Sequence, residues 1–337
     1  MKIAVLMSGG VDSTVSALLL KEAGHRILGL TMIAWDEQAA HKATAAARGL
    51  GIEHRVVDLR GVFQEKVVDY FCRSYERGET PNPCVECNRW VKFGALLEAA
   101  RQMGCDRVAT GHYARVEENG PGRFLLKRGI DQSKDQSYFL YALVGRQLAH
   151  IVFPLGEYSK DEVRALAVRR GLPVAEEKES QEICFVAGDY RDFLKDRVEA
   201  RPGDIVDQQG RVLGTHRGIP FYTIGQRKGL GVAGGRPLYV SALRKESNRV
   251  VLGDNEQLFS KSLLAADCNF ISIGALLEPL AVQAKIRYRA ALAGAVITPQ
   301  DKLIRVDFQE SQRAITPGQS VVFYDGDYVV GGGRIVS

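Results

Sequence analysis

The segment Ser8–Ser13, with the sequence Ser-Gly-Gly-Val-Asp-Ser, contains the residue types that bind a polyphosphate. It follows the apolar run Ile3–Met7 and precedes the helix-forming run Thr14–Leu20, so a strand, a tight turn and a helix start are predicted to meet there. Backbone N–H groups, the helix N-terminus and two hydroxyl groups would converge on one spot, and two glycines would let the backbone approach an anion. The Asp12 carboxylate would repel a bare phosphate but can bind a magnesium ion that bridges its oxygens. The segment lacks the Gly-Lys-Ser/Thr ending of a Walker A loop.

Two cysteines, Cys84 and Cys87, lie in a second segment whose side chains could take part in a reaction. Pro81 and Pro83 make this segment extended and rigid, just before a helix that we expect to start near Arg89. A thiol near a helix N-terminus has a lowered pKa and therefore more thiolate. The pair could be half of a zinc site or a redox pair, but the sequence has no second close pair of ligands. One closed zinc site would combine the residues Cys84, Cys87, Cys184 and His112.

Cys184 stands alone in the segment 180–185, 97 residues after Cys87 in the chain. Two distant thiols brought together in an ATP-using enzyme suggest sulfur transfer through a persulfide and a transient disulfide. Lys178 and Arg191 flank Cys184 in the sequence and could favour its thiolate.

Length and composition indicate a globular enzyme-sized protein. The chain has 337 residues, 45% hydrophobic and 25% charged, which predicts two or three domains with a real core. No apolar stretch is long enough for a membrane span, and the N-terminal apolar run is too short for a signal peptide, so we expect a cytoplasmic protein without membrane contact. Six cysteines in such a protein do not indicate a structural disulfide framework. The apolar surroundings of three of them predict buried thiols at Cys72, Cys105 and Cys268.

The first half of the chain alternates strands with helices, which predicts a parallel, doubly wound α/β sheet. The expected strands are Lys2–Met7, Arg26–Met32, Ile52–Val57 and Arg107–Thr110. The expected helices are Thr14–Ala23, Glu37–Arg48, Val62–Tyr75, Trp90–Met103, Ser137–Ala149, Lys160–Arg170 and Tyr190–Val198. Ser159 and Glu162 form a capping box for the helix from Lys160. Ligands of such sheets bind beyond the carboxyl ends of the strands, where the candidate loops are Ser8–Ser13, the stretch after Met32 and Gly111–Tyr113.

After residue 200 the periodicity falls to two and glycine becomes frequent, so a small β domain and then a β-barrel are expected. We place the units at 1–200, 201–260 and 261–337. The expected strands are Asp204–Val206, Val212–His216, Tyr239–Ala242, Val250–Leu252, Val282–Arg287, Leu303–Phe308 and Ser320–Tyr324. Between residues 201 and 250 the chain has nine Lys or Arg residues and three Asp or Glu residues. This stretch is either an ordinary solvated surface or a patch for nucleic-acid backbone.

The loop Ser8–Ser13 resembles the PP-loop of the ATP pyrophosphatases, whose fold is adenine nucleotide alpha hydrolase-like. The chain as a whole, from Met1 to about Tyr324, resembles the tRNA-specific 2-thiouridylase family. The motifs that carry this resemblance occur in one order: Ser8–Ser13, Pro-Asn-Pro-x-x-x-Cys-Asn at 81–88, Thr110–Ala114, Lys134–Tyr138, Ser180–Phe185 and Gly225–Gly231.

The resemblance implies a tRNA-uridine 2-sulfurtransferase that uses ATP and magnesium to adenylate O2 of the wobble uridine in tRNA. A persulfide on Cys184 would supply sulfur, Cys87 would be the nucleophile that resolves it, and AMP would leave. The implied ATP-binding residues are Leu6, Met7, Ser8, Gly9, Gly10, Val11, Asp12, Ser13, Met32 and Gly111. Those implied to contact the target base are Asn82, Pro83 and Cys84. Those implied to contact tRNA are His112, Lys134, Asp135, Gln136, Arg287, Tyr288 and Gln319. Without the resemblance, Met32 would be ordinary core and His112 a structural histidine.

One position departs from the family pattern, because familiar members have Asp where this chain has Cys84. The chain therefore has three thiols, at Cys84, Cys87 and Cys184, which can hold a four-iron four-sulfur cluster with one iron open for sulfide. Under this hypothesis neither a persulfide nor a disulfide is required. Cluster and persulfide both remain open at this stage, as does the sulfur donor, which could be a desulfurase relay protein or sulfide.

Two other classes of function compete with tRNA thiolation. An adenylating ligase of the same loop family would act on a small carboxylate or amide and would give Cys184 no role. A non-enzymatic RNA-binding module would bind ATP without forming pyrophosphate. The thiol pair in a proline-braced loop argues against both.

Overall fold

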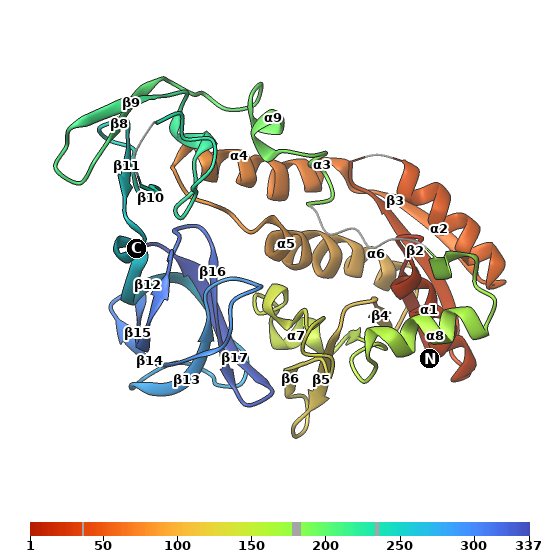
Figure 1. Ribbon diagram of the computed structural model, residues 1–337. Coiled ribbons are helices and arrows are strands. Elements are labelled where there is room, and N and C mark those ends of the chain that lie inside the picture. Colours follow the sequence, from red (N-terminus) through yellow and green to blue (C-terminus); the bar gives the residue numbers. More distant parts are fainter. Residues whose placement is uncertain (36, 177–182, 233–235) are drawn as a thin grey trace.

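The computed structural model describes residues 1–35, 37–176, 183–232 and 236–337, which form three successive units (Figure 1). The first is an α/β unit with the N-terminus, the second a small β unit, and the third a β-barrel with the C-terminus. This arrangement confirms the fold class expected from the sequence. Within the described ranges, no helix is both long and apolar enough to cross a lipid bilayer.

A five-stranded parallel sheet with the order β3-β2-β1-β4-β7 forms the centre of the α/β unit. Its strands are β1 (Lys2–Leu6), β2 (Arg26–Ile33), β3 (Glu53–Asp58), β4 (Arg107–Ala109) and β7 (Ile151–Val152). The sequence predicted the first four, whereas β7 is too short to leave a pattern. The chain winds to opposite sides of the sheet from β1 and β4, so the loops that follow these two strands diverge and leave a crevice at the carboxyl edge.

The helical segments of this unit are α1 (Val11–Glu22), α2 (Gln38–Gly49), α3 (Arg60–Phe63), η1 (Gln64–Val68), α4 (Asp69–Glu76), α5 (Pro83–Glu86), η2 (Cys87–Ala95), α6 (Leu96–Gln102), η3 (Ser137–Phe139), α7 (Gly145–Leu148), α8 (Lys160–Arg169), η4 (Pro173–Glu176) and α9 (Tyr190–Leu194). They cover both faces of the sheet, because successive residues of β1 point to opposite sides. Ile3 and Val5 pack with α1 and α2, while Ala4 packs with α6.

Two helices differ from the sequence-based prediction. The helix expected near Arg89 already starts at Pro83, because proline fits the first helical position, where no N–H is needed. The prediction of one helix over Ser137–Ala149 is wrong, since only the short segments η3 and α7 form there. The backbone of Val144 is extended, so α7 begins anew at Gly145.

The start of α8 has the predicted capping box. The Ser159 N–H donates to Glu162 Oε2 over 2.7 Å, and the Glu162 N–H donates to Ser159 Oγ over 3.3 Å. Two backbone donors that the helix leaves unpaired are satisfied in this way. The helix packs beside α1, with Val163 and Ala167 against Val15 (Figure 1).

The small β unit has a four-stranded sheet in the order β10-β11-β8-β9. Its strands, β8 (Gly203–Val206), β9 (Val212–His216), β10 (Tyr239–Arg244) and β11 (Arg249–Gly253), lie where the sequence predicted short strands. The 3-10 turns η5 (Ile219–Phe221) and η6 (Asn255–Leu258) flank them. Alternating apolar residues such as Ile205, Val250 and Leu252 fill its core.

The C-terminal unit is a closed barrel with the strand order β12-β15-β14-β13-β16-β17, and β12 also pairs with β17. Closure leaves no unpaired edge among these strands. The strands are β12 (Phe259–Phe270), β13 (Leu280–Lys285), β14 (Ala293–Gln300), β15 (Leu303–Arg313), β16 (Ser320–Asp325) and β17 (Tyr328–Ile335). The sequence missed a hairpin of the α/β unit, β5 (Ala114–Glu118) and β6 (Phe124–Arg128), which extends the barrel sheet beside β17.

The α/β unit and the barrel share one apolar core. Tyr138 and Leu140 of the first unit pack with Val322 and Tyr324 of the barrel, and all four side chains are almost fully buried. The Tyr138 hydroxyl donates to the carbonyl oxygen of Ser320 over 2.8 Å. The shared core makes the barrel a fixed support for the neighbouring loops.

Replacing Tyr138 with phenylalanine should lower the free energy of unfolding by about 1–3 kcal/mol, because the Ser320 carbonyl loses its buried donor. Urea unfolding followed by circular dichroism measures the change. Tyr158→Phe is the matched control, since the half-buried Tyr158 hydroxyl bonds to none of the described residues. Equal unfolding midpoints for the two variants would contradict a stabilising role of this bond.

Candidate active site

The loop Met7–Gly10 connects β1 to α1 at the carboxyl edge of the sheet. Its turn is held by Ser13, whose Oγ accepts from the Ser8 N–H over 3.2 Å and donates to the Gly10 carbonyl over 3.1 Å. Gly9 has a φ of 81°, and a Cβ there would lie 2.5 Å from Lys42 Cβ and 2.8 Å from the Lys42 carbonyl carbon in α2. Only glycine therefore allows the loop to lie this close to α2.

The other predicted ATP-binding residues gather around this loop. The Met7 N–H donates to the Leu30 carbonyl over 2.9 Å, which aligns the ends of β1 and β2. Met32, near the end of β2, is half-buried against two core clusters. Gly111 follows β4, and a Cβ there would lie 2.8 Å from both the carbonyl carbon and the Cβ of Asp12. The three predicted loops thus meet at the crevice.

Asp12, in the first turn of α1, is bound by Tyr113 of the candidate loop Gly111–Tyr113 and by Lys160, which the sequence analysis did not single out as a site residue. Lys160 Nζ lies 2.7 Å from Asp12 Oδ1 and 2.8 Å from Oδ2, and the Tyr113 hydroxyl donates to Oδ1 over 2.9 Å. Lys160 is 148 residues away in the chain, so spacing gave no sign of the pair. The ammonium cancels the negative charge that would otherwise face a phosphate.

The proline-braced thiol loop is anchored by the barrel. The Thr80 N–H donates to the Pro317 carbonyl over 2.8 Å, and Gln319 Nε2 donates to the carbonyls of Thr80 and Pro81 over 2.9 and 3.2 Å. Asn82 then caps α5. The side chain of Gln319 is therefore engaged within the chain, next to the residues expected to contact the target base.

The thiols of Cys84 and Cys87 differ in exposure, and neither has the lowered pKa that we expected. Cys84 is exposed and Cys87 is buried. Although Cys84 is exposed as a residue, neighbouring protein atoms desolvate its thiol and raise its pKa, and burial raises the pKa of Cys87 to about 12. The prediction of more thiolate is wrong because the helix starts at Pro83, which leaves Cys87 a full turn inside it and against an apolar cluster.

Cys184 lies close enough to the other two thiols for their charges to interact, since it raises the pKa of both Cys84 and Cys87. Its neighbours Ile183 and Phe185 pack in the same cluster as Cys87. Cys184 is exposed, and no disulfide joins any two of the six cysteines, which all lie within the described residues. Folding thus brings a thiol from 97 residues away to the proline-braced loop. Lys178 lies outside the described residues, and Arg191 Nη1 is 3.3 Å from Asp189 Oδ2.

Lys92 is a second residue that the sequence analysis missed. Its ammonium lowers the pKa of Cys84, Cys87 and His112, so it is the positive charge that these three groups share. The His112 ring is packed 6.0 Å from Phe93 between ring centroids, and Thr110 Oγ1 is 2.7 Å from its Nδ1. Burial lowers the pKa of His112 well below its usual value, so the imidazole is neutral at physiological pH.

The predicted tRNA contacts at residues 134–136 have different environments. The Asp135 carboxylate is buried and accepts from Gly129 N–H, Ser137 N–H and Ser137 Oγ, so its side chain faces the interior. Gln136 Oε1 accepts from the Tyr113 N–H over 3.1 Å. Lys134 is half-buried. Asp135 therefore shapes this loop rather than presenting a carboxylate at the surface.

Arg287 and Tyr288 follow β13 of the barrel. Arg287 is exposed and donates from Nη1 to the Arg313 carbonyl over 2.9 Å. The Tyr288 ring lies 4.6 Å from that of Phe139 between centroids, so this pair from the barrel packs beside the segment that follows Gln136.

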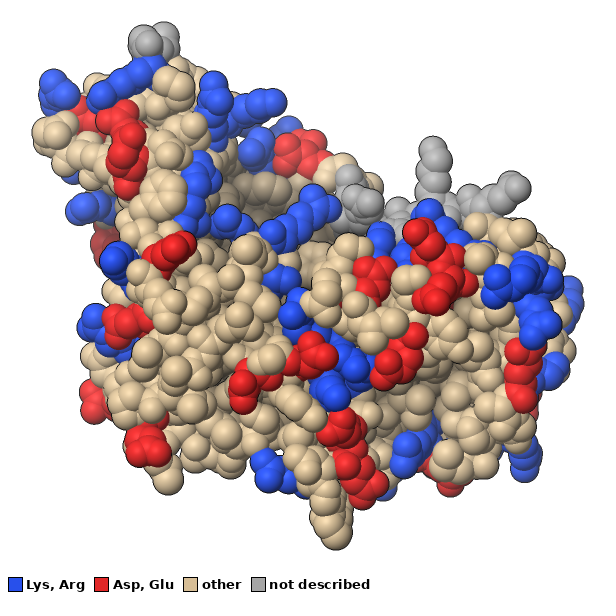
Figure 2. All heavy atoms as spheres, turned by 60° about the horizontal axis from the view of Figure 1, so that its bottom comes forward, with Lys and Arg blue, Asp and Glu red and all other residues tan. Residues whose placement is uncertain are grey.

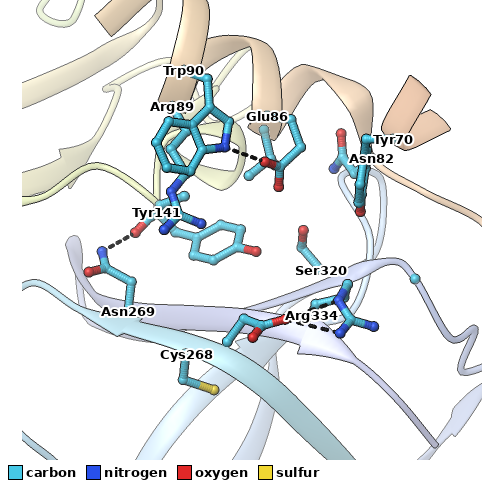
Figure 3. Close-up of a pocket in the computed structure, with 14 residues that line it drawn as sticks. Tyr70, Asn82, Glu86, Arg89, Trp90, Tyr141, Cys268, Asn269, Ser320 and Arg334 are labelled. Carbon is cyan, nitrogen blue, oxygen red and sulfur yellow. Dashed lines mark hydrogen bonds and ion pairs between the residues drawn. The ribbon is translucent and has the colours of Figure 1, made fainter. Parts of the chain in front are cut away.

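A cavity of about 460 Å³ lies between the thiol helix and the barrel (Figure 3). Glu86 lines it from α5 and Trp90 from η2, and Trp90 Nε1 donates to Glu86 Oε2 over 2.8 Å, while Arg334 lines the cavity from the barrel. Asn82 also contributes to the wall. The lining residues do not include Cys84, Cys87 or Cys184, and the thiol at the cavity wall is that of Cys268.

Lys and Arg side chains gather along the hollow between the small β unit and the α/β unit (Figure 2). The basic stretch 201–250 contributes to the small β unit. The basic residues of this stretch that form no ion pair with any described residue are Arg217, Arg227, Lys228, Arg244 and Lys245. These five side chains are exposed, and exposed cations without an ion pair fit an extended polyanion.

Bound metals and clusters require donor side chains that converge on one point. In the described ranges, no three His, Cys, Asp or Glu side chains stand together as ligands of a metal ion. Magnesium is usually held through one carboxylate and the substrate phosphates, for which Asp12 fits at the loop. For a cluster, Cys87 is buried against apolar side chains while Cys84 and Cys184 are exposed, so the three thiols are near one another but have different surroundings.

Family models match nearly the whole chain. They are described as a tRNA methyl transferase HUP domain at residues 1–188, a tRNA methyl transferase PRC-barrel domain at 191–254 and an aminomethyltransferase beta-barrel domain at 260–335. Among curated proteins, the tRNA-specific 2-thiouridylase MnmA of Syntrophomonas wolfei is 55% identical over 99% of this chain and 100% of its own. That of Moorella thermoacetica is 52% identical over 99% of each chain. A solved 4-thiouridine synthetase–RNA complex with bound ATP covers 55% of this chain and 44% of its own, at 17% identity and a TM-score of 0.39, too low to assign a common fold.

Gly9→Ala should weaken ATP binding at least about tenfold, because the added Cβ collides with α2 and forces the loop to move. Isothermal titration calorimetry measures the affinity. Gly24→Ala is the matched control, because Gly24 also has a positive φ, of 83°, but has no atom within 4 Å of an added Cβ. Equal affinities in the two variants would show that the close approach to α2 is not needed for ATP binding.

Lys92→Met should slow the alkylation of Cys87 by iodoacetamide at pH 8, since the ammonium that lowers its pKa is lost. In the unmodified chain a pKa of about 12 already leaves roughly a thousandfold less thiolate than an ordinary thiol near 9, so the rate should keep rising above pH 10. Mass spectrometry of the Cys87 peptide measures both effects. Lys66→Met, which removes an ammonium paired with Glu65, should leave the rate unchanged. A rate that levels off below pH 9 would refute the raised pKa.

Proposed function

This chain belongs to the tRNA-specific 2-thiouridylase family, and we propose that it catalyses the ATP-dependent 2-thiolation of the wobble uridine in tRNA. The observation that carries the proposal is the approach of Cys184 to the thiols of Cys84 and Cys87, within a chain that also forms the glycine-rich anion loop. Thiols and an ATP loop are the groups that a sulfur transfer driven by adenylation requires.

The names of the matching families and relatives leave a choice between two transferred groups. The family models are described as methyl and aminomethyl transferases, whereas the relatives are named thiouridylases. A methyl transfer gives no role to three thiols gathered from two distant segments. Sulfur transfer uses them, so the site supports thiolation over methylation.

ATP would bind with its phosphates at the loop Ser8–Ser13. The uridine O2 attacks the α-phosphorus, the bond from that phosphorus to the bridging oxygen breaks, and pyrophosphate leaves with the electron pair. The amide-like O2 is a poor leaving group, and its AMP ester is a good one. When bound, magnesium would neutralise charge on the phosphates, and Asp12 is the carboxylate available to hold it.

Sulfur would reach the base from a persulfide on Cys184. Its terminal sulfur attacks C2 of the adenylated uridine, AMP leaves with the bonding electrons, and the base becomes linked to Cys184 through a disulfide. The Cys87 thiolate then attacks Cys184 Sγ, which releases the 2-thiouridine and leaves a Cys87–Cys184 disulfide. A dithiol reductant resets the pair with two electrons, and a desulfurase relay protein or sulfide with an oxidant supplies the next persulfide.

Cys87 must lose its proton to act, although burial opposes this. Lys92 is the neighbouring charge that favours the thiolate, and the neutral His112 imidazole beside it can accept a proton. Burial of Cys87 also protects it from other electrophiles before the base arrives. The site thus keeps its nucleophile protonated until the substrate is in place.

The target base must leave the anticodon stack to reach the thiols. We assign Asn82, Pro83 and Cys84 to its recognition, because they begin the helix that carries Cys87. The units 201–260 and 261–337 would hold the tRNA backbone, the first through its unpaired cations. The remaining contacts are proposed at His112, Lys134, Gln136, Arg287, Tyr288 and Gln319, with Asp135 shaping the loop. The enzyme would act in the cytoplasm.

A four-iron four-sulfur cluster on Cys84, Cys87 and Cys184 is the alternative sulfur route. The persulfide route is supported over a cluster because the described His, Cys, Asp and Glu side chains include no group of three placed to hold a metal, whereas Cys184 lies near Cys87. Anaerobic purification followed by iron and acid-labile sulfide assays distinguishes the two sulfur routes. Stoichiometric iron in the active protein would contradict the persulfide route.

The function is tested by incubating unmodified tRNA with the protein, ATP and a persulfide donor, then analysing its nucleosides by mass spectrometry. We expect 2-thiouridine at the wobble position and one AMP per thiouridine. AMP release that does not depend on tRNA would instead indicate an adenylating ligase. ATP binding without pyrophosphate would indicate a regulatory RNA-binding module, and a methylated base would indicate a methyltransferase.

Cys87→Ser and Cys184→Ser should each lower thiolation at least about a thousandfold while tRNA-dependent pyrophosphate release persists, because they remove only the sulfur chemistry. Cys84→Asp should remain active, because a persulfide route does not need this thiol. Cys72→Ser, at a half-buried thiol on α4, is the control and should retain activity. Loss of activity in Cys84→Asp together with loss of bound iron would contradict the persulfide route.

A further inference from the structure

The ion pair between Lys160 and Asp12 stands at the edge of the phosphate loop and has no role in the chemistry described so far. The ammonium bonds both carboxylate oxygens, at 2.7 and 2.8 Å. Lys160 is only 5% exposed, while the Asp12 side chain is 32% exposed. A buried lysine thus reaches a carboxylate that itself faces the crevice.

Several contacts hold this ammonium in place. Lys160 is the first residue of α8, whose start is fixed by the Ser159–Glu162 capping box. The Lys160 N–H donates to Asp131 Oδ2 over 3.0 Å, and Nζ lies 5.7 Å from the centre of the Tyr113 ring. The Tyr113 hydroxyl binds Asp12 Oδ1 from another side. The charge is therefore positioned before any ligand arrives.

Stability alone is a weak reason to bury such a pair. The cost of removing two charges from water often equals or exceeds their attraction, and apolar pairs of similar volume can stabilise a fold as well. A phosphate site gives the pair a use. Without Lys160, the carboxylate of Asp12 would repel the triphosphate at the N-terminus of α1; with it, the loop meets the phosphates without net negative charge.

We propose that Lys160 binds the β- and γ-phosphates of ATP, the part that leaves as pyrophosphate, and that Asp12 holds its ammonium at the loop until the nucleotide arrives. The inference rests on the proposed ATP-dependent function and adds a residue to it. As the bond to the α-phosphorus breaks, negative charge builds on the departing pyrophosphate, and the ammonium offsets that charge. AMP lacks these phosphates, so its binding does not involve Lys160.

Isothermal titration calorimetry on the full chain tests this with three probes: α,β-methylene-ATP, which cannot be cleaved at that bond, inorganic pyrophosphate and AMP. Lys160→Met should weaken the first two by about 10- to 100-fold, the size of one charge-assisted contact, and AMP by less than about twofold. Lys21→Met is the control, because Lys21 lies at the opposite end of α1 and donates to the Leu50 carbonyl. It should leave all three affinities unchanged.

Asp12→Asn provides a second test that keeps the lysine, and it stands even if Lys160→Met does not fold. Measured in EDTA, where no magnesium competes for the carboxylate, this variant should bind pyrophosphate at least as tightly as the unmodified chain, because the ammonium is released to the ligand. Weaker binding would overturn the proposal, as would equal losses for AMP and pyrophosphate in Lys160→Met. If the unmodified chain binds none of the three probes, the proposed ATP chemistry fails as well. If the unmodified chain binds the probes but Lys160→Met does not weaken pyrophosphate binding more than AMP binding, only this inference is overturned.

Discussion

The packing of the barrel against the α/β unit determines where the thiols lie. Gln319 and Pro317 of the barrel bind the backbone of Thr80 and Pro81, and Tyr138 reaches the barrel through Ser320. These are buried or half-buried backbone groups that need partners, so the loop cannot shift without leaving them unsatisfied. The barrel therefore acts on the chemistry from a distance, by holding the residues just before the thiol helix.

Two opposing electrostatic demands meet at the site. The nucleophile needs a thiolate, which burial disfavours, and the nucleotide needs a loop without excess negative charge, although Asp12 stands in it. In both places a lysine supplies the compensation, Lys92 for the thiols and Lys160 for the carboxylate. Lys92 lies in η2, the helical segment that starts at Cys87, whereas Lys160 begins α8, which packs beside α1.

The sequence predicted what depends on neighbouring residues. The strand–turn–helix at Ser8–Ser13, the Ser159 capping box and the short strands of the small β unit follow from local pattern and are present. The sequence-based predictions were wrong where tertiary packing determines the local structure or the pKa. Apolar residues in 137–149 indicated a helix but are buried in a core shared with the barrel, and the pKa of Cys87 follows from its burial rather than from its place near a helix start.

Long-range partners left no sign in the sequence for a further reason. A lysine in an amphipathic helix is ordinary, and Lys160 differs from its neighbours only because α8 packs on α1 with its first turn beside Asp12. The same holds for Lys92, whose charge matters because His112 and the thiols fold around it. A motif thus identifies the groups that react, while packing decides which charges assist them: Lys160 from a second helix, and Lys92 from within the helical segment of Cys87. For this chain, those charges connect the nucleotide loop and the thiol loop to the rest of the α/β unit.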